Sequence, residues 1–142
     1  MKRIICLDIG DKRIGIAMSD PFGMTAQALA TLQRTTFRAD AAKILEILKE
    51  YQVGLVLIGL PLNSESQEGP QAKKVRHFEG GLAKFLKEKN HAATIEWVDE
   101  SFSSREAEVF LLEADLSRKK RKKVIDKMAA AVVLQNYLDE HG

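Results

Sequence analysis

The alternation of apolar and polar positions predicts three β-strands in the first quarter of the chain. Apolar residues occupy both faces of the first strand, Lys2–Asp8, so this strand needs cover on both sides. The turn residues Gly10-Asp11-Lys12, followed by the alternating stretch Arg13–Asp20, predict a hairpin. After a break at Pro21, the segment Thr25–Leu32 is predicted as a third strand.

The middle of the chain changes to a helical period that alternates with apolar strands. Asp40–Gln52 and Gln71–Lys89 carry apolar residues at spacings of three and four, which predicts two helices. Val53–Leu60 and Thr94–Asp99 predict two further strands. Pro61–Pro70, which contains two prolines and several small polar residues, predicts a loop between a strand and a helix.

The last third of the chain predicts two more helices. One is expected to start at Ser103–Glu106, where a serine cap and an early acid stand together, and the other covers Asp126–Leu138. The basic run between them interrupts the helical pattern. The full order predicts an α/β fold, in which helices flank a mixed five-stranded sheet whose first three strands are antiparallel.

Composition limits the class of protein. The 142 residues are 45% hydrophobic and 30% charged, which predicts a single globular domain over residues 1–142. One cysteine, Cys6, and three scattered histidines exclude an internal disulfide and a Cys/His zinc site. The apolar runs are too short for a membrane span or a signal peptide, so we expect a cytoplasmic protein with no membrane partner.

Positive charge is concentrated in one segment. The chain has 22 Lys and Arg against 20 Asp and Glu, a net charge of +2, but six basic residues are consecutive: Arg118, Lys119, Lys120, Arg121, Lys122 and Lys123. The other 16 basic residues against the 20 acids leave a net charge of −4. Such a run is either a solvated face or flexible loop, or a segment that contacts phosphates.

Three acids stand where elements end or begin. Asp8 ends the first strand, Glu100 follows the last strand, and Asp126 opens the last helix. At about 100° per residue, Asp126 shares a helix stripe with Ala130 and Val133, which must face the interior. Each acid alone also has a structural explanation: Asp8 as a turn residue, Glu100 as a surface acid, and Asp126 as an acid favoured by the helix dipole.

Clustered carboxylates repel one another unless a cation neutralises them. Magnesium takes octahedral oxygen ligands from a few carboxylates, water and phosphate. Two such ions about 4 Å apart can activate water and stabilise the leaving oxygen of a phosphodiester. Asp8, Glu100 and Asp126 together would therefore suit a metal-dependent phosphodiesterase.

Several motifs in the right order make the chain closely resemble the YqgF/RuvX family over nearly its whole length. They are Leu7-Asp8-Ile9-Gly10, Lys12-Arg13-Ile14-Gly15-Ile16-Ala17, Ser19-Asp20, Gly59-Leu60-Pro61-Leu62-Asn63, Val98-Asp99-Glu100, Asp126-Lys127, Ala129-Ala130 and Leu134-Gln135. The resemblance implies the ribonuclease H-like fold of RuvC-type resolvases. It also implies a nuclease that uses Mg²⁺ or Mn²⁺, with two ions held by the catalytic residues Asp8, Glu100 and Asp126.

The chain departs from the family at one position. The arginine that follows the glutamate in the family's Asp-Glu-Arg motif is Ser101 here. The family's following Thr pair is Ser103-Ser104. If that arginine binds a phosphate, its role passes to Arg105 or to the basic run.

Further residues are candidates for binding nucleic acid. Lys12 and Arg13 stand at a hairpin tip beside Asp8, either as phosphate ligands or as two solvated turn residues. Asn63 belongs to a loop that leaves the sheet after a strand, a common place for ligand contacts. Because the basic run precedes Asp126 closely, its phosphate-contacting interpretation is favoured in this context.

The first functional hypothesis, which the family resemblance implies, is a nuclease that processes the 5′ end of precursor 16S rRNA. The nearest rival is a Holliday junction resolvase, and no motif distinguishes RNA from branched DNA. Symmetrical junction cutting would require a homodimer, whereas RNA cleavage permits a monomer. A non-catalytic nucleic-acid-binding module is a second class. A nucleotide phosphotransferase, suggested by the Asp8–Gly10 turn, is disfavoured because such enzymes need two domains of this kind.

Overall fold

The computed structural model describes residues 2–61, 69–99 and 118–141, and for Asp99 and residues 118–128 it describes the backbone alone. All five predicted strands are present, each within one residue of its expected bounds. The elements are β1 (Arg3–Ile9), β2 (Arg13–Ser19), β3 (Ala26–Gln33), α1 (Phe37–Glu50), β4 (Val53–Leu60), α2 (Pro70–Glu88), β5 (Thr94–Asp99) and α4 (Arg118–His141).

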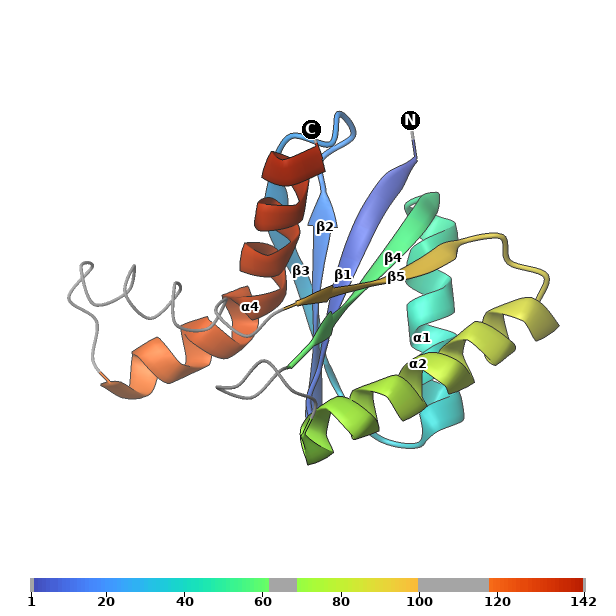
Figure 1. Ribbon diagram of the computed structural model, residues 1–142, viewed down its shortest axis with the longest axis horizontal. Helices are drawn as coiled ribbons and strands as arrows, with labels where there is room; N and C mark the ends of the chain where they lie inside the picture. Colours follow the sequence, from blue (N-terminus) through green and yellow to red (C-terminus); the bar gives the residue numbers. More distant parts are fainter. Residues whose placement is uncertain (1, 62–68, 100–117, 142) are drawn as a thin grey trace.

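The strands form one mixed sheet in the order β3-β2-β1-β4-β5. β1 and β2 are antiparallel, as are β2 and β3, which confirms the predicted antiparallel arrangement of the first three strands. β1, β4 and β5 run parallel. The carboxyl ends of these three strands therefore meet at one edge of the sheet, which we call the carboxyl edge (Figure 1).

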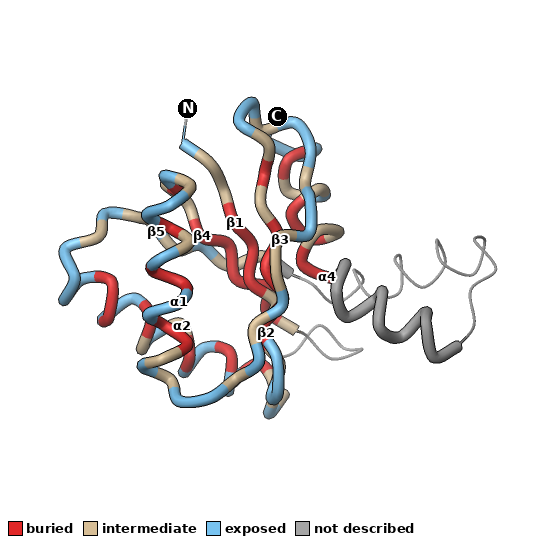
Figure 2. Tube along the Cα trace, turned by 180° about the vertical axis from the view of Figure 1, so that it is seen from behind, coloured by how far each residue is buried: buried red, intermediate tan, exposed pale blue. Residues whose placement is uncertain are grey.

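Each face of the sheet is covered by helix (Figures 1 and 2). Ile5 and Leu7 of β1 pack in the larger core with α1 and α2, whereas Cys6, between them, packs in the smaller core with α4. The smaller core consists of Cys6, Ala17, Leu57, Ala130, Val133, Leu134 and Leu138. Burial of both faces of β1 confirms the prediction from its apolar residues on both faces, and β4 also contributes residues to both cores.

Local signals explain where α1 and α2 begin. Thr36 caps α1 because its side chain accepts a hydrogen bond from the backbone N–H of Ala39, at 3.2 Å, so the helix starts three residues before the expected Asp40. α2 starts at Pro70, whose missing N–H costs nothing at a first helical position. The predicted apolar stripes of both helices are buried.

The last helix differs from the prediction. α4 begins at Arg118, so the basic run belongs to the helix and Asp126 lies more than two turns inside it. Lys and Arg are good helix formers, and the run contains no Gly or Pro to stop a helix. The loss of apolar periodicity therefore indicated a change in packing and not the end of a helix. Asp126 consequently lies too far from the helix start for the dipole explanation.

The other expectations for connecting segments lie outside the described residues. These are the loop at 62–68 and the helix predicted to start at Ser103–Glu106. In the part of the chain that is described, no helix combines the length and the apolar character needed to cross a bilayer.

Two adjacent glycines in the middle of α2 have different surroundings. A Cβ added at Gly81 would meet the Phe37 ring at 2.7 Å, whereas one added at Gly80 would meet nothing within 4 Å. The Phe37 ring in turn makes an edge-on contact with Phe78, with centroids 5.3 Å apart. Gly81 therefore allows the start of α1 to approach α2 closely, while Gly80 opens a surface hollow.

These surroundings predict opposite consequences for two similar substitutions. Gly80→Ala should raise the free energy of unfolding by about 1 kcal/mol, because alanine is the better helix former and has open space. Gly81→Ala should raise the free energy of unfolding by less than this, or lower it, because the added Cβ must displace the Phe37 ring. Urea unfolding of the two variants measures the difference, and equal stabilisation would show that Phe37 adapts freely.

Candidate functional site

Asp8 lies near the end of β1 and is half-buried. It stands opposite Gly15 in the hairpin register. Because side chains alternate along a strand, Asp8 shares its face with Cys6, the face that α4 covers. The only acid of β1 therefore lies at the carboxyl edge of the sheet, on the α4 side.

Of the other two predicted acids, Glu100 lies outside the described residues and Asp126 is described as helical backbone alone. Glu100 directly follows β5, whose last residue Asp99 pairs with Leu60 at the end of the neighbouring strand. Asp126 lies one helical turn before Ala130, which is fully buried against the sheet.

The direction of α4 follows from contacts at its other end. Gln135 accepts a hydrogen bond from the backbone N–H of Ala26 at 2.9 Å, and donates to the carbonyl of Met24 at 3.1 Å. Ala26 begins β3, at the sheet edge opposite to the carboxyl edge. Because α4 contacts that opposite edge near its C-terminus, its earlier residues run towards the carboxyl edge.

The turn between β1 and β2 is closed tightly. The N–H of Gly10 donates to the carbonyl of Arg13 at 2.9 Å. A Cβ on Gly10 would meet the same carbonyl oxygen at 2.9 Å, so this close approach requires glycine. Lys12 and Arg13 are exposed at the tip, as the sequence predicted.

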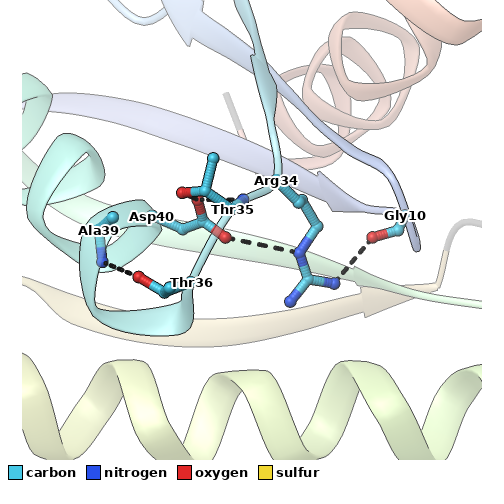
Figure 3. Close-up of polar contacts among 6 residues, drawn as sticks. All are labelled: Gly10, Arg34, Thr35, Thr36, Ala39 and Asp40. Atoms are coloured by element: carbon cyan, nitrogen blue, oxygen red, sulfur yellow. Dashed lines mark hydrogen bonds and ion pairs between the residues drawn. The ribbon is translucent and has the colours of Figure 1, made fainter.

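Arg34, just after β3, holds this turn from one side (Figure 3). Its backbone N–H donates to the carbonyl of Lys12, and its guanidinium Nη1 donates to the carbonyl of Gly10, both at 2.9 Å. The guanidinium also lies over the Phe78 ring, 5.2 Å from its centroid. One arginine thus fixes two carbonyl groups of the turn that follows Asp8.

Arg34 is itself held by a buried carboxylate, Asp40, which is 1% exposed (Figure 3). Oδ1 of Asp40 accepts hydrogen bonds from the N–H and the hydroxyl of Thr35, at 3.1 and 3.2 Å. Oδ2 has no hydrogen-bond partner among the described residues and lies 3.7 Å from Nε of Arg34 as an ion pair. The charge of Asp40 therefore depends on Arg34 for compensation.

Residues near the start of α2 contact the β1–β2 turn from the other side. Nε2 of Gln71 lies 3.4 Å from the carbonyl oxygen of Ile9, the last residue of β1. Nζ of Lys74 lies 3.3 Å from a carboxylate oxygen of Asp11, with both side chains 63% exposed. The first contact restrains the end of β1, and the second is a weak surface pair.

The motif residues Ser19 and Asp20 have structural roles at the opposite edge. The buried Ser19 hydroxyl accepts a hydrogen bond from the N–H of Ile4 at 3.0 Å. Asp20 Oδ1 accepts from the N–H groups of Thr25 and Met24, at 2.9 and 2.6 Å. The Thr25 hydrogen bond contributes most to lowering the pKa of Asp20, which keeps the carboxylate ionised as the organiser of the β2–β3 turn.

The side chains of the remaining predicted nucleic-acid ligands lie outside the described part of the structure. Asn63 and Arg105 lie outside the described residues. The run Arg118–Lys123 is described as helical backbone only. Within the described part, no group of three His, Cys, Asp or Glu side chains is close enough to hold a metal ion. The side chains of Glu100 and Asp126 lie outside that part.

The structure identifies two residues that the sequence analysis missed, Arg34 and Asp40. A signal for Asp40 was available, because it precedes Ile44 and Leu48 by four and eight residues on the apolar stripe of α1. An acid on such a stripe is buried and needs a partner. No comparable pattern marks Arg34, which follows the end of a strand.

Comparisons with known proteins agree with this architecture. The family model described as "RuvX: Holliday junction resolvase" matches residues 2–140. A Syntrophomonas wolfei protein, whose name marks it as a candidate pre-16S rRNA nuclease, is 47% identical over 137 residues, covering 96% of this chain and 94% of its own length. A Desulforamulus reducens protein of the same name is 48% identical over 137 residues, covering 96% of each chain.

The fold is also similar to that of a solved resolvase. The structure of Thermus thermophilus RuvC in complex with a Holliday junction substrate aligns with a TM-score of 0.58 and 14% sequence identity, covering 100% of this chain and 97% of that one. This similarity confirms the predicted ribonuclease H-like arrangement of sheet and helices.

The ion pair beneath the turn predicts strong coupling between Arg34 and Asp40. Arg34→Met should lower the free energy of unfolding by about 3 kcal/mol, because it leaves the buried Oδ2 of Asp40 uncompensated. Adding Asp40→Asn should recover roughly half of that loss, since the neutral amide needs no counter-charge. Urea unfolding of both single variants and the double variant measures the coupling. Additive effects would show that the two side chains act independently.

Proposed function

Because the chain belongs to the RuvX family, we propose that it is a divalent-metal nuclease that hydrolyses phosphodiester bonds at the 5′ end of precursor 16S rRNA. The observation that carries the proposal is the shared carboxyl edge of β1, β4 and β5. Asp8 lies near the end of the first of these strands and Glu100 directly follows the last. Asp126 lies on the helix that packs across the same face as Asp8.

The chemistry of the proposed ligand set fits a hard divalent ion. Asp8, Glu100 and Asp126 offer only carboxylate oxygens, which suit Mg²⁺ or Mn²⁺ better than softer metals. Three carboxylates can hold two such ions. When bound, these ions would supply activation of water and stabilisation of the leaving oxygen.

The protein's own groups would position the substrate. Lys12 and Arg13, exposed at the tip of the turn, are within the same hairpin as Asp8 and can neutralise phosphates beside the scissile bond. Arg34 and Gln71 restrain the backbone of that turn. A restrained turn keeps Asp8 in one orientation, which reduces reorganisation during the reaction.

Precursor rRNA is preferred to branched DNA because the relatives that cover nearly all of this chain carry the pre-16S rRNA name. The proposed substrate has a single cleavage region, so one copy of the chain suffices, whereas symmetrical junction cutting needs two. A cytoplasmic location follows from this substrate. The same proposal includes the metal ions, the three acids and a set of RNA ligands. These ligands are Lys12, Arg13, Asn63, Arg105 and Arg118–Lys123.

The proposed role of Asp8 as a metal ligand predicts that one conservative substitution greatly reduces the rate of cleavage. Asp8→Asn should reduce Mg²⁺-dependent cleavage of a precursor 16S rRNA fragment at least about 100-fold, because it removes one carboxylate ligand. Asp139→Asn, which neutralises an exposed acid near the end of α4, is the matched control and should cleave normally. Gel analysis of end-labelled RNA gives the rates. Undiminished cleavage by Asp8→Asn would refute the proposed site.

The substrate preference predicts a second outcome. With Mg²⁺ or Mn²⁺, the protein should cleave the precursor 16S rRNA fragment and leave a synthetic four-way DNA junction intact, because recognition uses features particular to RNA. Chelation with EDTA should stop cleavage without preventing RNA binding. Cleavage of the junction but not of the RNA would reverse the assignment, and binding without any cleavage would identify a non-catalytic module.

A further inference from the structure

A second basic region lies on α2, apart from the basic run of α4. An open cavity of about 920 Å³ is lined by Arg34, Phe37, Lys73, Lys74, Arg76, His77, Phe78, Gly80, Gly81 and Lys84. Among these described lining residues are five with permanent positive charge, and none is Asp or Glu. A chain with a net charge of only +2 therefore has a pronounced local excess of positive charge here.

Three of the five charged residues are already engaged. Arg34 pairs with Asp40 and Lys74 with Asp11. The guanidinium of Arg76 lies over the Trp97 ring, 4.9 Å from its centroid. The charges that remain to be used by a partner are those of Lys73 and Lys84, both exposed, with His77 exposed between them.

The helix arranges these residues along a line. Lys73, His77 and Lys84 fall on one stripe of α2, with Gly80 between the last two. Lys73 and Lys84 are eleven residues apart, which corresponds to roughly 16 Å along the helix axis. Because Gly80 has no side chain and open space above it, a bound chain can approach the helix backbone between the two lysines.

An extended line of charge favours a polymer over a small anion. A single phosphate is bound best by groups that converge on one point, whereas one strand of a nucleic acid presents a phosphate about every 3.4 Å along its axis. The lining also includes the half-buried ring of Phe37, which can contact a ribose or a base, whereas the Phe78 ring is buried and covered by the Arg34 guanidinium. Both features fit a nucleic-acid strand.

Two residues that line the cavity also contact the candidate catalytic turn. Lys74 contacts Asp11 of the turn, and Arg34 contacts the carbonyl of Gly10. However, α2 covers the face of the sheet opposite to the one that Asp8 faces. A strand in this cavity is thus near the turn but on its other side, so it is a flanking part of the substrate and not the scissile phosphate.

We infer that the stripe Lys73–His77–Lys84 of α2 binds the phosphate backbone of an RNA segment that flanks the cleavage site. This inference rests on the proposed function for its choice of RNA. The stripe contributes affinity and leaves the chemical step unchanged, because its lysines lie on the opposite face from Asp8.

The test is the double variant Lys73→Gln/Lys84→Gln. Its matched control is Lys43→Gln/Lys49→Gln, which removes the same charge from exposed positions on α1. Binding of a labelled precursor 16S rRNA fragment is measured by fluorescence anisotropy over a range of salt concentrations. EDTA is present throughout, so the readout does not depend on cleavage.

Loss of two phosphate contacts should reduce the slope of log affinity against log salt by about 1.4 to 1.8. At about 0.1 M salt this corresponds to roughly 25- to 60-fold weaker binding. The control should retain the wild-type slope within error. With metal present, the double variant should show a raised KM and an unchanged rate at saturating RNA.

Three results would overturn the inference. One is a slope equal to that of the α1 control. A second is unchanged RNA binding together with weaker binding of inorganic phosphate, which would indicate a small-anion site. The third is unchanged RNA binding together with weaker binding of an acidic peptide, which would indicate a protein partner. If the wild-type protein binds RNA without cleaving it and the double variant still loses affinity, the inference stands and only the proposed catalysis fails.

Discussion

Burial of both faces of β1 is the constraint on which the rest of the structure depends. Its side chains alternate between a core under α1 and α2 and a core under α4, so that within the strand a charged group would lose water on either side. The middle of the strand is fully buried, so a charged residue fits only near its ends, and Asp8 lies at the end that reaches the carboxyl edge. Parallel pairing with β4 and β5 then brings the ends of three strands together.

The position of Asp8 is maintained by groups outside its own strand. Gly10 closes the turn at a distance that no other residue permits, and Arg34 binds two of the turn's carbonyls. Asp40 holds that arginine from beneath, so a buried charge pair supports a loop at the surface. Such a pair contributes little net stability but strongly penalises loss of either partner, which makes it suited to fixing one conformation.

Much of this architecture could be predicted from the sequence because it follows from periodicity. Strand bounds were correct to within one residue, since alternation and the turn at Gly10 are local signals. The start of α4 was wrong because apolar spacing reports packing, and the helix continues through the basic run without it. The contact between Gly81 and the Phe37 ring joins two helices 44 residues apart in sequence, and no local pattern encodes it.

The candidate site was predictable to a different extent. The place of Asp8 near a strand end was predicted correctly and Lys12 and Arg13 are exposed as expected, while the catalytic role of Asp8 stays a prediction. The support provided by Arg34 and Asp40 was missed, because an ion pair between a strand end and a helix start exists only once the sheet has brought them together. The roles of Glu100 and Asp126 stay predictions.

The turn that follows Asp8 also lies between two surfaces with different tasks. The α4 side of the turn carries the proposed catalytic acid Asp8. The α2 side carries the basic stripe, which is proposed to bind substrate that flanks the cleavage site. Arg34 contacts the carbonyl of Gly10 through its guanidinium and also lines the α2 cavity, so one side chain touches both the turn and the cavity. Binding along α2 would add affinity for a flanking strand, and the chemistry proposed for Asp8 would stay on the other face of the sheet. In the proposed arrangement, the residues that add affinity and the residue that acts in catalysis lie on opposite sides of the sheet, beside the same turn.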